Sequence, residues 1–204
     1  MKPKLRLAVF ASGSGSNLEA LIRAEKAGKL KSEIALVVCD NPDAYAIARA
    51  NKYGKPVFLC EPKTFGSRED YEKAMVEVLK KDKIGLVVLA GFMRILTPYF
   101  VGAFRGRILN IHPSLLPAFP GAHAIRDAFQ QGAKVTGVTV HFVTEELDGG
   151  PIILQRSVEV GPHETLDALE ARIHKIEHRL YPEAVRLFAK DKLSIRNRKV
   201  TIER

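Results

Sequence analysis

The chain has 204 residues, of which 46% are hydrophobic and 27% are charged, and its formal net charge is +9. A chain of this length can bury more than about two thirds of its unfolded surface, so it can build a core of its own. The composition is that of an ordinary globular protein, and no apolar run approaches the ~20 residues of a membrane helix. We therefore expect a globular domain without a membrane partner.

Much of the positive charge lies in a short carboxy-terminal stretch, Lys190–Arg204, and on helical faces where Lys and Glu alternate. No aromatic stacking motif accompanies these basic residues. We expect a solvated surface that attracts anionic metabolites, and no nucleic-acid partner. A basic nucleic-acid-binding module is the alternative, and it predicts binding that weakens steeply with salt.

The amino terminus combines basic residues with an apolar stretch, as a signal peptide does. The stretch Leu5–Ala11 contains Arg6, is short, and leads directly into a Gly-rich loop. We therefore expect a first β-strand in a mature cytoplasmic chain. Cys39 and Cys60 form no C-x-x-C pair, so we expect buried free thiols in a reducing compartment and no metal site.

The first half of the chain alternates short apolar strands with helices. The apolar runs are nearly continuous, which is typical of strands covered on both faces. They occur at Leu5–Phe10, Ile34–Cys39, Val57–Leu59, Leu86–Leu89 and Ile108–Ile111. One helix is expected from Ser16 to Ala27, with Ser16 and Glu19 at capping-box spacing, and another from Ser67 to Lys81. This repetition predicts an α/β fold with a mostly parallel sheet and helices on both faces.

The last third has a different pattern. Two long strands, Val135–Val143 and Pro151–Glu159, flank a polar loop that ends in two glycines, which predicts an antiparallel or mixed edge of the sheet. A long helix follows from about Thr165 to Lys190, and we expect Pro182 to kink it. Because no repeat or linker interrupts the chain, a single domain is expected over residues 1–204.

A Gly-rich loop, residues 12–17, joins the first strand to the first helix. Free N–H groups and the helix dipole favour an anion at such a turn. The loop is not a P-loop, since no Gly-Lys-Ser/Thr follows. Gly13 and Gly15 also fit a dinucleotide fingerprint poorly because Leu18 replaces its third glycine, although Asp40 ends the second strand. A plain turn, a phosphate site and a nicotinamide site therefore remain open.

The most informative segment lies at the carboxyl end of the apolar strand 108–111. Asn110 and His112 are two residues apart, so they share a face of the strand. An amide N–H and an imidazole that both donate to a developing oxyanion suit acyl transfer. Asp148, in the Gly-ended loop, can orient the imidazole and favour its charged form. No nucleophile elbow is present, which favours direct transfer over a covalent acyl-enzyme. The alternative is that Asn110 and His112 have no chemical role and that their side chains form hydrogen bonds with neighbouring backbone groups.

At these residues the sequence resembles the folate-dependent formyltransferases. The runs NIHPSLLP (residues 110–117) and ELDGG (residues 146–150) match their catalytic Asn, His and Asp pattern. Within that group it is most similar to the phosphoribosylglycinamide formyltransferases of purine biosynthesis, through stretches 13–20, 90–96, 110–121 and 177–182. The resemblance covers nearly the whole chain.

The resemblance implies a Rossmann-like fold and direct formyl transfer from 10-formyltetrahydrofolate to the amine of glycinamide ribonucleotide, without a metal. It divides the chain into a phosphate-binding half (about 1–105), a folate-binding and catalytic half (about 106–190) and a short basic tail (191–204). The catalytic residues that it implies are Asn110, His112 and Asp148. The residues implied for the phosphorylated substrate are Gly15, Ser16, Asn17, Met93, Pro113 and Glu177. Those implied for the folate are Arg68, Arg94, Ile95, Leu96, Asn110, Val143 and Asp148.

One position departs from the resemblance. Some relatives carry Lys near the phosphate three residues before the Glu, whereas this chain carries His174 there and Lys175 beside it. One of these two residues contacts the phosphate, or the Gly-rich loop binds it alone. Methionyl-tRNA formyltransferases resemble the same domain and add a tRNA-binding domain, and formyl-folate hydrolases add a regulatory domain; we expect neither addition. A nicotinamide oxidoreductase is the rival from another class. The sequence is compatible with either a monomer or a homodimer.

Overall fold

The computed structural model describes residues 4–203. Met1–Pro3, from the segment considered as a leader, and Arg204, from the basic tail, lie outside the described residues. The strands are β1 (Leu5–Ala11), β2 (Ser32–Cys39), β3 (Val57–Leu59), β4 (Leu86–Leu89), β5 (Ile108–His112), β6 (Val135–Phe142), β7 (Ile152–Glu159), β8 (Leu193–Arg196) and β9 (Lys199–Ile202). The α-helices are α1 (Ser16–Lys26), α2 (Tyr45–Lys52), α3 (Arg68–Lys81), α4 (Pro98–Ala103), α5 (Ala124–Gln130) and α6 (Leu166–Ala189), and a 3₁₀ turn spans Pro62–Thr64.

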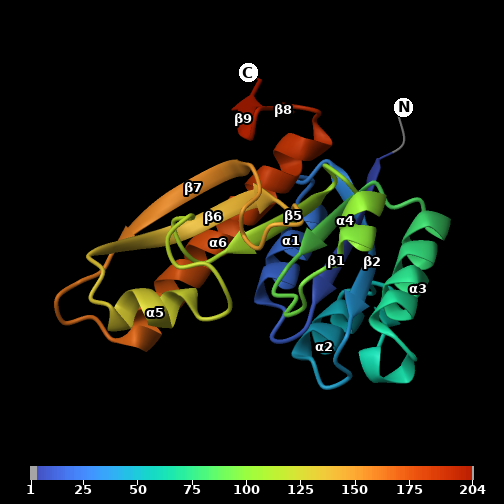
Figure 1. The fold of residues 1–204 in the computed structure, drawn as a ribbon, viewed down its shortest axis with the longest axis horizontal. Coiled ribbons are helices and arrows are strands. Elements are labelled where there is room, and N and C mark those ends of the chain that lie inside the picture. The colour runs from blue at the N-terminus through green and yellow to red at the C-terminus, as the bar shows by residue number, and fades with distance from the viewer. Residues whose placement is uncertain (1–3, 204) are drawn as a thin grey trace.

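A seven-stranded sheet with the order β3-β2-β1-β4-β5-β6-β7 forms the centre of the molecule (Figure 1). Strands β1 to β5 pair in parallel, and β6 and β7 add an antiparallel edge. The predicted mostly parallel sheet with a mixed edge is therefore confirmed. The strand order reverses between β1 and β4, and in open α/β sheets ligands bind beyond the carboxyl ends of the strands at such a switch point.

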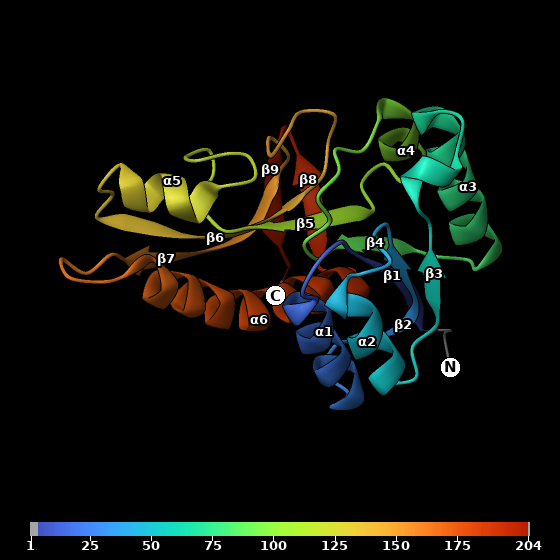
Figure 2. The same cartoon turned by 90° about the horizontal axis from the view of Figure 1, so that it is seen from below.

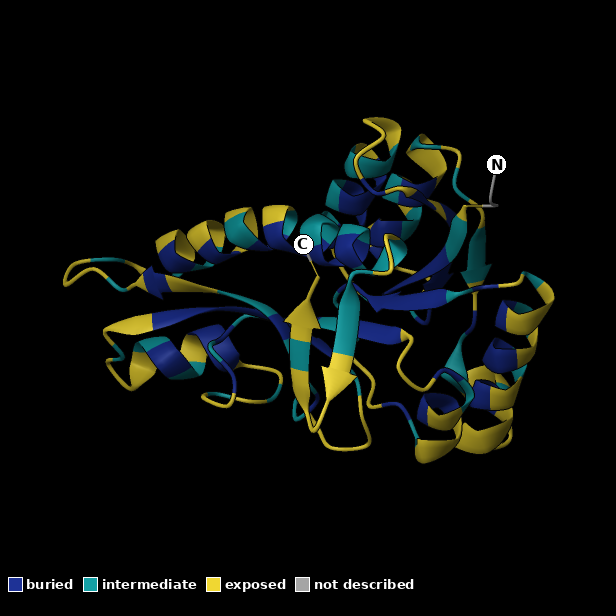
Figure 3. Ribbon diagram, turned by 90° about the horizontal axis from the view of Figure 1, so that it is seen from above, coloured by how far each residue is buried: buried dark blue, intermediate teal, exposed yellow. Residues whose placement is uncertain are grey.

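Helices cover both faces of the sheet, as predicted. Figure 2 shows α1, α2 and α6 below the sheet and α3, α4 and α5 above it. Side chains alternate along β1, so Leu7 and Val9 join the core under α1 and α6, whereas Ala8 and Phe10 join the core under α3 and α4. Both faces of β1 are thus buried, which explains its continuous apolar run. Exposed residues lie on the outer faces of the helices and along the β8–β9 hairpin (Figure 3).

Helix α6 packs along the sheet and contacts strands β5, β6 and β7. Its Thr165 side chain accepts a hydrogen bond from the Ala168 N–H at the amino end, and the helix continues without a break across Pro182. The buried Tyr181 hydroxyl lies 2.8 Å from the Leu89 carbonyl oxygen and 2.9 Å from the Leu109 carbonyl oxygen, on β4 and β5. Burial raises the pKa of this hydroxyl well above its ordinary value, so it stays a neutral donor.

Two local expectations differ from the structure. The predicted capping box at Ser16 and Glu19 is wrong: Gly15 is the N-cap residue, and Glu19 instead pairs with Arg23 and Arg49. The basic tail contains the β8–β9 hairpin, which the sequence analysis did not predict. No helix in the described part of the chain is long and apolar enough to cross a membrane.

Candidate active site

Strand β5 places Asn110 and His112 at the carboxyl end of the sheet, beside the end of β4. Antiparallel pairing with β6 sets Asn110 opposite His141 and His112 opposite Thr139. His112 is buried, with 4% of its surface exposed, and Asn110 is half-buried. The two predicted residues therefore lie at the same end of one central strand. Asn110 is paired with β4 on one side and β6 on the other, whereas His112 is paired with β6 alone.

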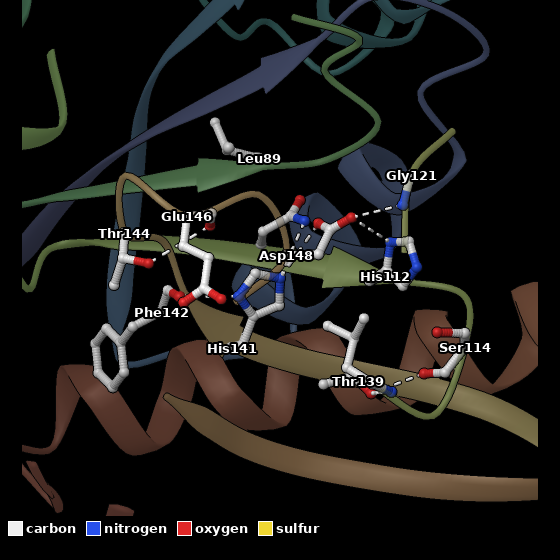
Figure 4. A network of polar contacts seen from close by, with 12 residues as sticks. Leu89, His112, Ser114, Gly121, Thr139, His141, Phe142, Thr144, Glu146 and Asp148 are labelled. Carbon is white, nitrogen blue, oxygen red and sulfur yellow. Dashed lines mark hydrogen bonds and ion pairs between the residues drawn. The ribbon is translucent and has the colours of Figure 1, made fainter. Parts of the chain in front are cut away.

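Asp148 reaches His112 from the loop between β6 and β7. Figure 4 shows its carboxylate facing both the His112 ring and the backbone nitrogen of Gly121. Its Oδ2 lies 3.6 Å from His112 Nδ1 and accepts a 2.9 Å hydrogen bond from the Gly121 N–H. The other ring nitrogen, Nε2, lies 2.8 Å from the Phe119 carbonyl oxygen and donates to it. The Phe119 contact fixes the ring and leaves Nδ1 facing the carboxylate.

A second imidazole, His141, completes the group. Its Nδ1 donates to the Phe142 carbonyl oxygen at 2.8 Å, so Nε2 accepts a 3.3 Å hydrogen bond from the Asn110 Nδ2–H. Nε2 also lies 3.8 Å from Asp148 Oδ1. Burial is the main cause that lowers the pKa of His141, which favours the neutral ring that this bonding requires. His141 thus orients the Asn110 amide while the second N–H of that amide stays free.

These residues line a cavity of about 360 Å³ at the carboxyl ends of β4 and β5. Nine of the sequence-predicted site residues meet there: Met93, Arg94, Ile95, Leu96, Asn110, His112, Pro113, Val143 and Asp148. A second cleft of about 590 Å³ shares the segment 92–96 with this cavity and extends it to Arg68. The two hollows therefore adjoin at the segment 92–96, and the second one reaches Arg68 at the start of α3.

The Gly-rich loop forms a separate part of the site. Gly15 has a left-handed φ of 71° at the N-cap of α1, and Ser16 and Asn17 begin the helix. The Met93 N–H donates to Ser12 Oγ at 3.0 Å, which joins this loop to the wall of the cavity. Asn17 Nδ2 donates to Glu177 Oε2 at 3.0 Å. Asn17 and Glu177, both predicted to bind the phosphorylated substrate, are thus in contact with each other, and neither lines the cavity that contains Asn110 and His112.

The acid at the end of β2 is already paired. Asp40 is buried, and its Oδ2 accepts a 2.7 Å hydrogen bond from Arg94 Nε. Its Oδ1 is also buried and makes no hydrogen bond within residues 4–203, so neither oxygen is exposed to a ribose. The nicotinamide interpretation thereby loses its main support. Within residues 4–203 no group of three or more His, Cys, Asp or Glu side chains is arranged to hold a metal ion.

The arrangement suits nucleophilic attack on a carbonyl carbon. The Asn110 amide and the His112 and His141 rings line one cavity, and the Asp148 carboxylate lies within 4 Å of both imidazoles. Such donors stabilise an oxyanion that develops in a low-dielectric site. A model of the formyl transferase family matches residues 5–185 of this chain, which include every one of these groups.

The chain belongs to the formyl transferase family.

Its relatives within the formyl transferases span nearly its full length. It is 46% identical to phosphoribosylglycinamide formyltransferase of Bacillus subtilis, over 89% of this chain and 93% of the relative. The crystal structure of glycinamide ribonucleotide transformylase 1 from Symbiobacterium toebii matches with a TM-score of 0.97 at 45% identity, covering 100% and 96% of the two chains. A formyltetrahydrofolate deformylase from Pseudomonas syringae matches with a TM-score of 0.91 at 26% identity, covering 100% of this chain and 67% of that one.

No sequence pattern that we identified in this formyl transferase indicated His141 or the segment 119–121. His141 sits inside the apolar run of β6 and looks like an ordinary strand residue. Its partner Asn110 is 31 positions away and meets it only through antiparallel pairing. The contacts from Phe119 and Gly121 are made by backbone atoms, so the type of side chain at these positions gives no indication of them. A His at an inward position of the strand after an Asn-x-His motif was the available clue for His141.

We predict that Gly15 is required for the stability of the Gly-rich loop. A Cβ there would lie 2.7 Å from Ala46 Cα and 2.8 Å from Ala46 Cβ, in addition to the left-handed φ. Gly15→Ala should lower the free energy of unfolding by about 1–3 kcal/mol. The matched control is Gly13→Ala, since a Cβ at Gly13 meets nothing within 4 Å. Urea denaturation measures both, and equal stability of the two variants would contradict the prediction.

We also predict a pH-dependent contribution from His174. Its Nδ1 lies 2.9 Å from Glu177 Oε2, and this hydrogen bond is the main cause that raises the pKa of His174. A raised pKa gives stability that is fully present below the unfolded value of about 6.5 and is lost as pH rises through the folded value. Because the side chain is 48% exposed, the contribution should not exceed about 1 kcal/mol.

The test compares His174→Asn with wild type in denaturant at about pH 5.5 and about pH 8.5. The variant should lose more stability at the lower pH. His163→Asn is the control, because His163 is exposed in the loop before α6. An equal loss at both pH values would mean that the charge on His174 does not stabilise the fold.

Proposed function

We propose that this formyl transferase transfers the formyl group of 10-formyltetrahydrofolate to the amine of glycinamide ribonucleotide, in purine biosynthesis. The observation that carries the proposal is the meeting of Asn110, His112 and Asp148 at one cavity, which adjoins the Gly-rich loop and a second cleft. Relatives named for this reaction match nearly the whole chain.

The acceptor binds between α1 and α6. Backbone N–H groups of Gly15, Ser16 and Asn17 hold its phosphate at the start of α1, where the helix dipole favours an anion. The Glu177 carboxylate accepts hydrogen bonds from the ribose hydroxyls, and Asn17 holds that carboxylate in place. The glycinamide then extends past Met93 and Pro113 into the catalytic cavity.

The donor binds in the joined clefts. Its pterin lies against the segment Arg94–Leu96, Val143 and the loop that carries Asp148. Its benzoylglutamate arm follows the cleft toward Arg68, whose guanidinium meets the anionic end. The formyl carbon then lies beside Asn110 and His112, where both substrates meet.

The reaction follows directly from this geometry. The neutral amine attacks the formyl carbon, a C–N bond forms, and the carbonyl oxygen becomes an oxyanion that Asn110 and His112 stabilise by donation. His112 donates from Nδ1, because its Nε2–H is bonded to the Phe119 carbonyl oxygen. The tetrahedral intermediate collapses when the bond from carbon to the folate nitrogen breaks. The attacking amine loses one proton and the folate nitrogen gains one, with Asp148 and His112 positioned to relay it. The products are the formylated amide and tetrahydrofolate.

Isothermal titration with glycinamide ribonucleotide tests the acceptor site. We expect saturable binding at one site per chain, and much weaker binding of glycinamide without its phosphoribosyl group. Glu177→Gln should weaken binding of the ribonucleotide, because an amide accepts fewer hydrogen bonds from the ribose. Equal binding of both ligands would contradict the proposed phosphate site. The working unit is a monomer or a homodimer, and sedimentation at assay concentration distinguishes them.

A further inference from the structure

The β8–β9 hairpin reaches the loop that carries Asp148. Asn197 and Arg198 form its two-residue turn, with φ values of 47° and 65°. The turn directs the Arg198 guanidinium onto the loop at two points. Its Nη2 lies 3.0 Å from Glu146 Oε2 and also donates to the Gly149 carbonyl oxygen. These contacts lie on either side of Asp148 in the sequence.

The hairpin itself is firmly anchored. The hairpin follows closely after α6, and two backbone hydrogen bonds hold it there. The Lys192 N–H donates to the Leu187 carbonyl oxygen at 3.1 Å, and the Glu203 N–H donates to the Lys192 carbonyl oxygen at 2.9 Å. Leu193 and Val200 pack against the core beneath α6. Arg198 therefore connects an anchored element to the loop, rather than two mobile segments to each other.

Asp148 itself holds the loop to the cavity through the Gly121 N–H, and backbone hydrogen bonds close the loop at two further points. Its base is closed by the Phe142 N–H to the Pro151 carbonyl at 2.9 Å, and its tip by the Gly149 N–H to the Glu146 carbonyl at 3.2 Å. Behind it, a cleft of about 520 Å³ separates residues 146–150 from residues 198–200. This cleft leaves unfilled space beside the loop on its hairpin side, and Arg198, which lines the cleft, contacts both Glu146 and Gly149.

We propose that Arg198 is a positioning residue that holds the 144–150 loop, and with it Asp148, in the geometry that closes the folate side of the cavity. The inference rests on the proposed function for its kinetic readout. The side chains of Arg198 and Glu146 are 70% and 61% exposed, so the pair adds little to global stability. The effect of the pair is local, because it stabilises one position of the loop that contains Asp148.

Arg198→Ala is expected to raise the KM for the formyl donor and lower kcat, by a combined factor of about 3 to 10, with the KM for the acceptor and the Tm unchanged. Arg198→Lys should recover part of the loss. Its ammonium group keeps the positive charge near the loop but lacks the planar set of N–H donors of the guanidinium. The matched control is Arg196→Ala, which removes the same charge from an exposed position on the same hairpin. It should behave as wild type.

Hydrogen exchange provides a readout that does not depend on the reaction. Amides of residues 144–150 should exchange faster in Arg198→Ala than in wild type or Arg196→Ala, while exchange in β6 and α6 stays the same. If wild type formylates the acceptor but Arg198→Ala matches it in both donor KM and loop exchange, the positioning role is wrong. If wild type does not formylate the acceptor, the proposed function fails, and the exchange result alone still decides whether Arg198 holds the loop.

Discussion

Replacement of Asn110 by alanine should lower the kcat of formyl transfer about 10²–10³-fold, equivalent to about 2.7–4 kcal/mol of transition-state stabilisation. Asn110 lines the catalytic cavity and uses one N–H to bond to His141 Nε2 at 3.3 Å. Its other N–H remains available to an oxyanion. Because the bond to His141 is made before substrate arrives, the amide needs no reorganisation during the reaction.

Steady-state kinetics with both substrates varied measures this effect. The KM for the acceptor should change little, since Asn110 is not part of the Gly-rich loop or of the Glu177 network. Asn51→Ala serves as the control, because Asn51 is exposed on α2. A near-normal kcat in Asn110→Ala would remove the amide from the chemistry.

Asp148→Asn is expected to lower kcat by about 10²-fold, within the range that general acid–base groups contribute. The carboxylate lies 3.6 Å from His112 Nδ1 and 3.8 Å from His141 Nε2. The isosteric amide keeps the volume and can still accept from the Gly121 N–H, so the loop should keep its fold. What is lost is the negative charge beside His112, the imidazole that we propose to take part in the reaction.

The comparison with Asp148→Ala separates charge from loop structure. If charge is what matters, both variants should lose similar activity, and only the alanine variant should also show faster hydrogen exchange around Gly121. Asp167→Asn, at an exposed position in the first turn of α6, controls for the removal of one carboxylate. An active Asp148→Asn enzyme with a normal kcat would show that Asp148 is only a loop or folate contact.

Much of the fold follows from local pattern in the sequence. Strands buried on both faces leave continuous apolar runs, and the predicted bounds of β3 and β4 match the structure. The cap at Ser67, which accepts from the Asp70 N–H, was also predictable because its partner is three residues away. Glu19 shows the limit of this reasoning. Its partner Arg49 lies on another helix, and that ion pair outcompetes the expected capping box.

The site was less predictable where it depends on pairing between distant strands. Asn110 and His112 stand out because they end an apolar strand as polar residues. His141 does not stand out, since its role depends on the register of β6 against β5. The hairpin that carries Arg198 has only a weak apolar pattern on mostly exposed strands, so its contact with the 144–150 loop could not be read from the sequence.

The most direct test of the account is a stoichiometric assay with 10-formyltetrahydrofolate, in the presence and absence of glycinamide ribonucleotide. Mass spectrometry follows the formylated ribonucleotide and free formate, and absorbance follows tetrahydrofolate. The account predicts one formylated product for each tetrahydrofolate, no turnover without the acceptor, and loss of product formation in Asn110→Ala. Release of formate at the same rate with and without the ribonucleotide would contradict it, because water rather than the amine would then be the acceptor, as the name of the Pseudomonas syringae deformylase implies for that relative.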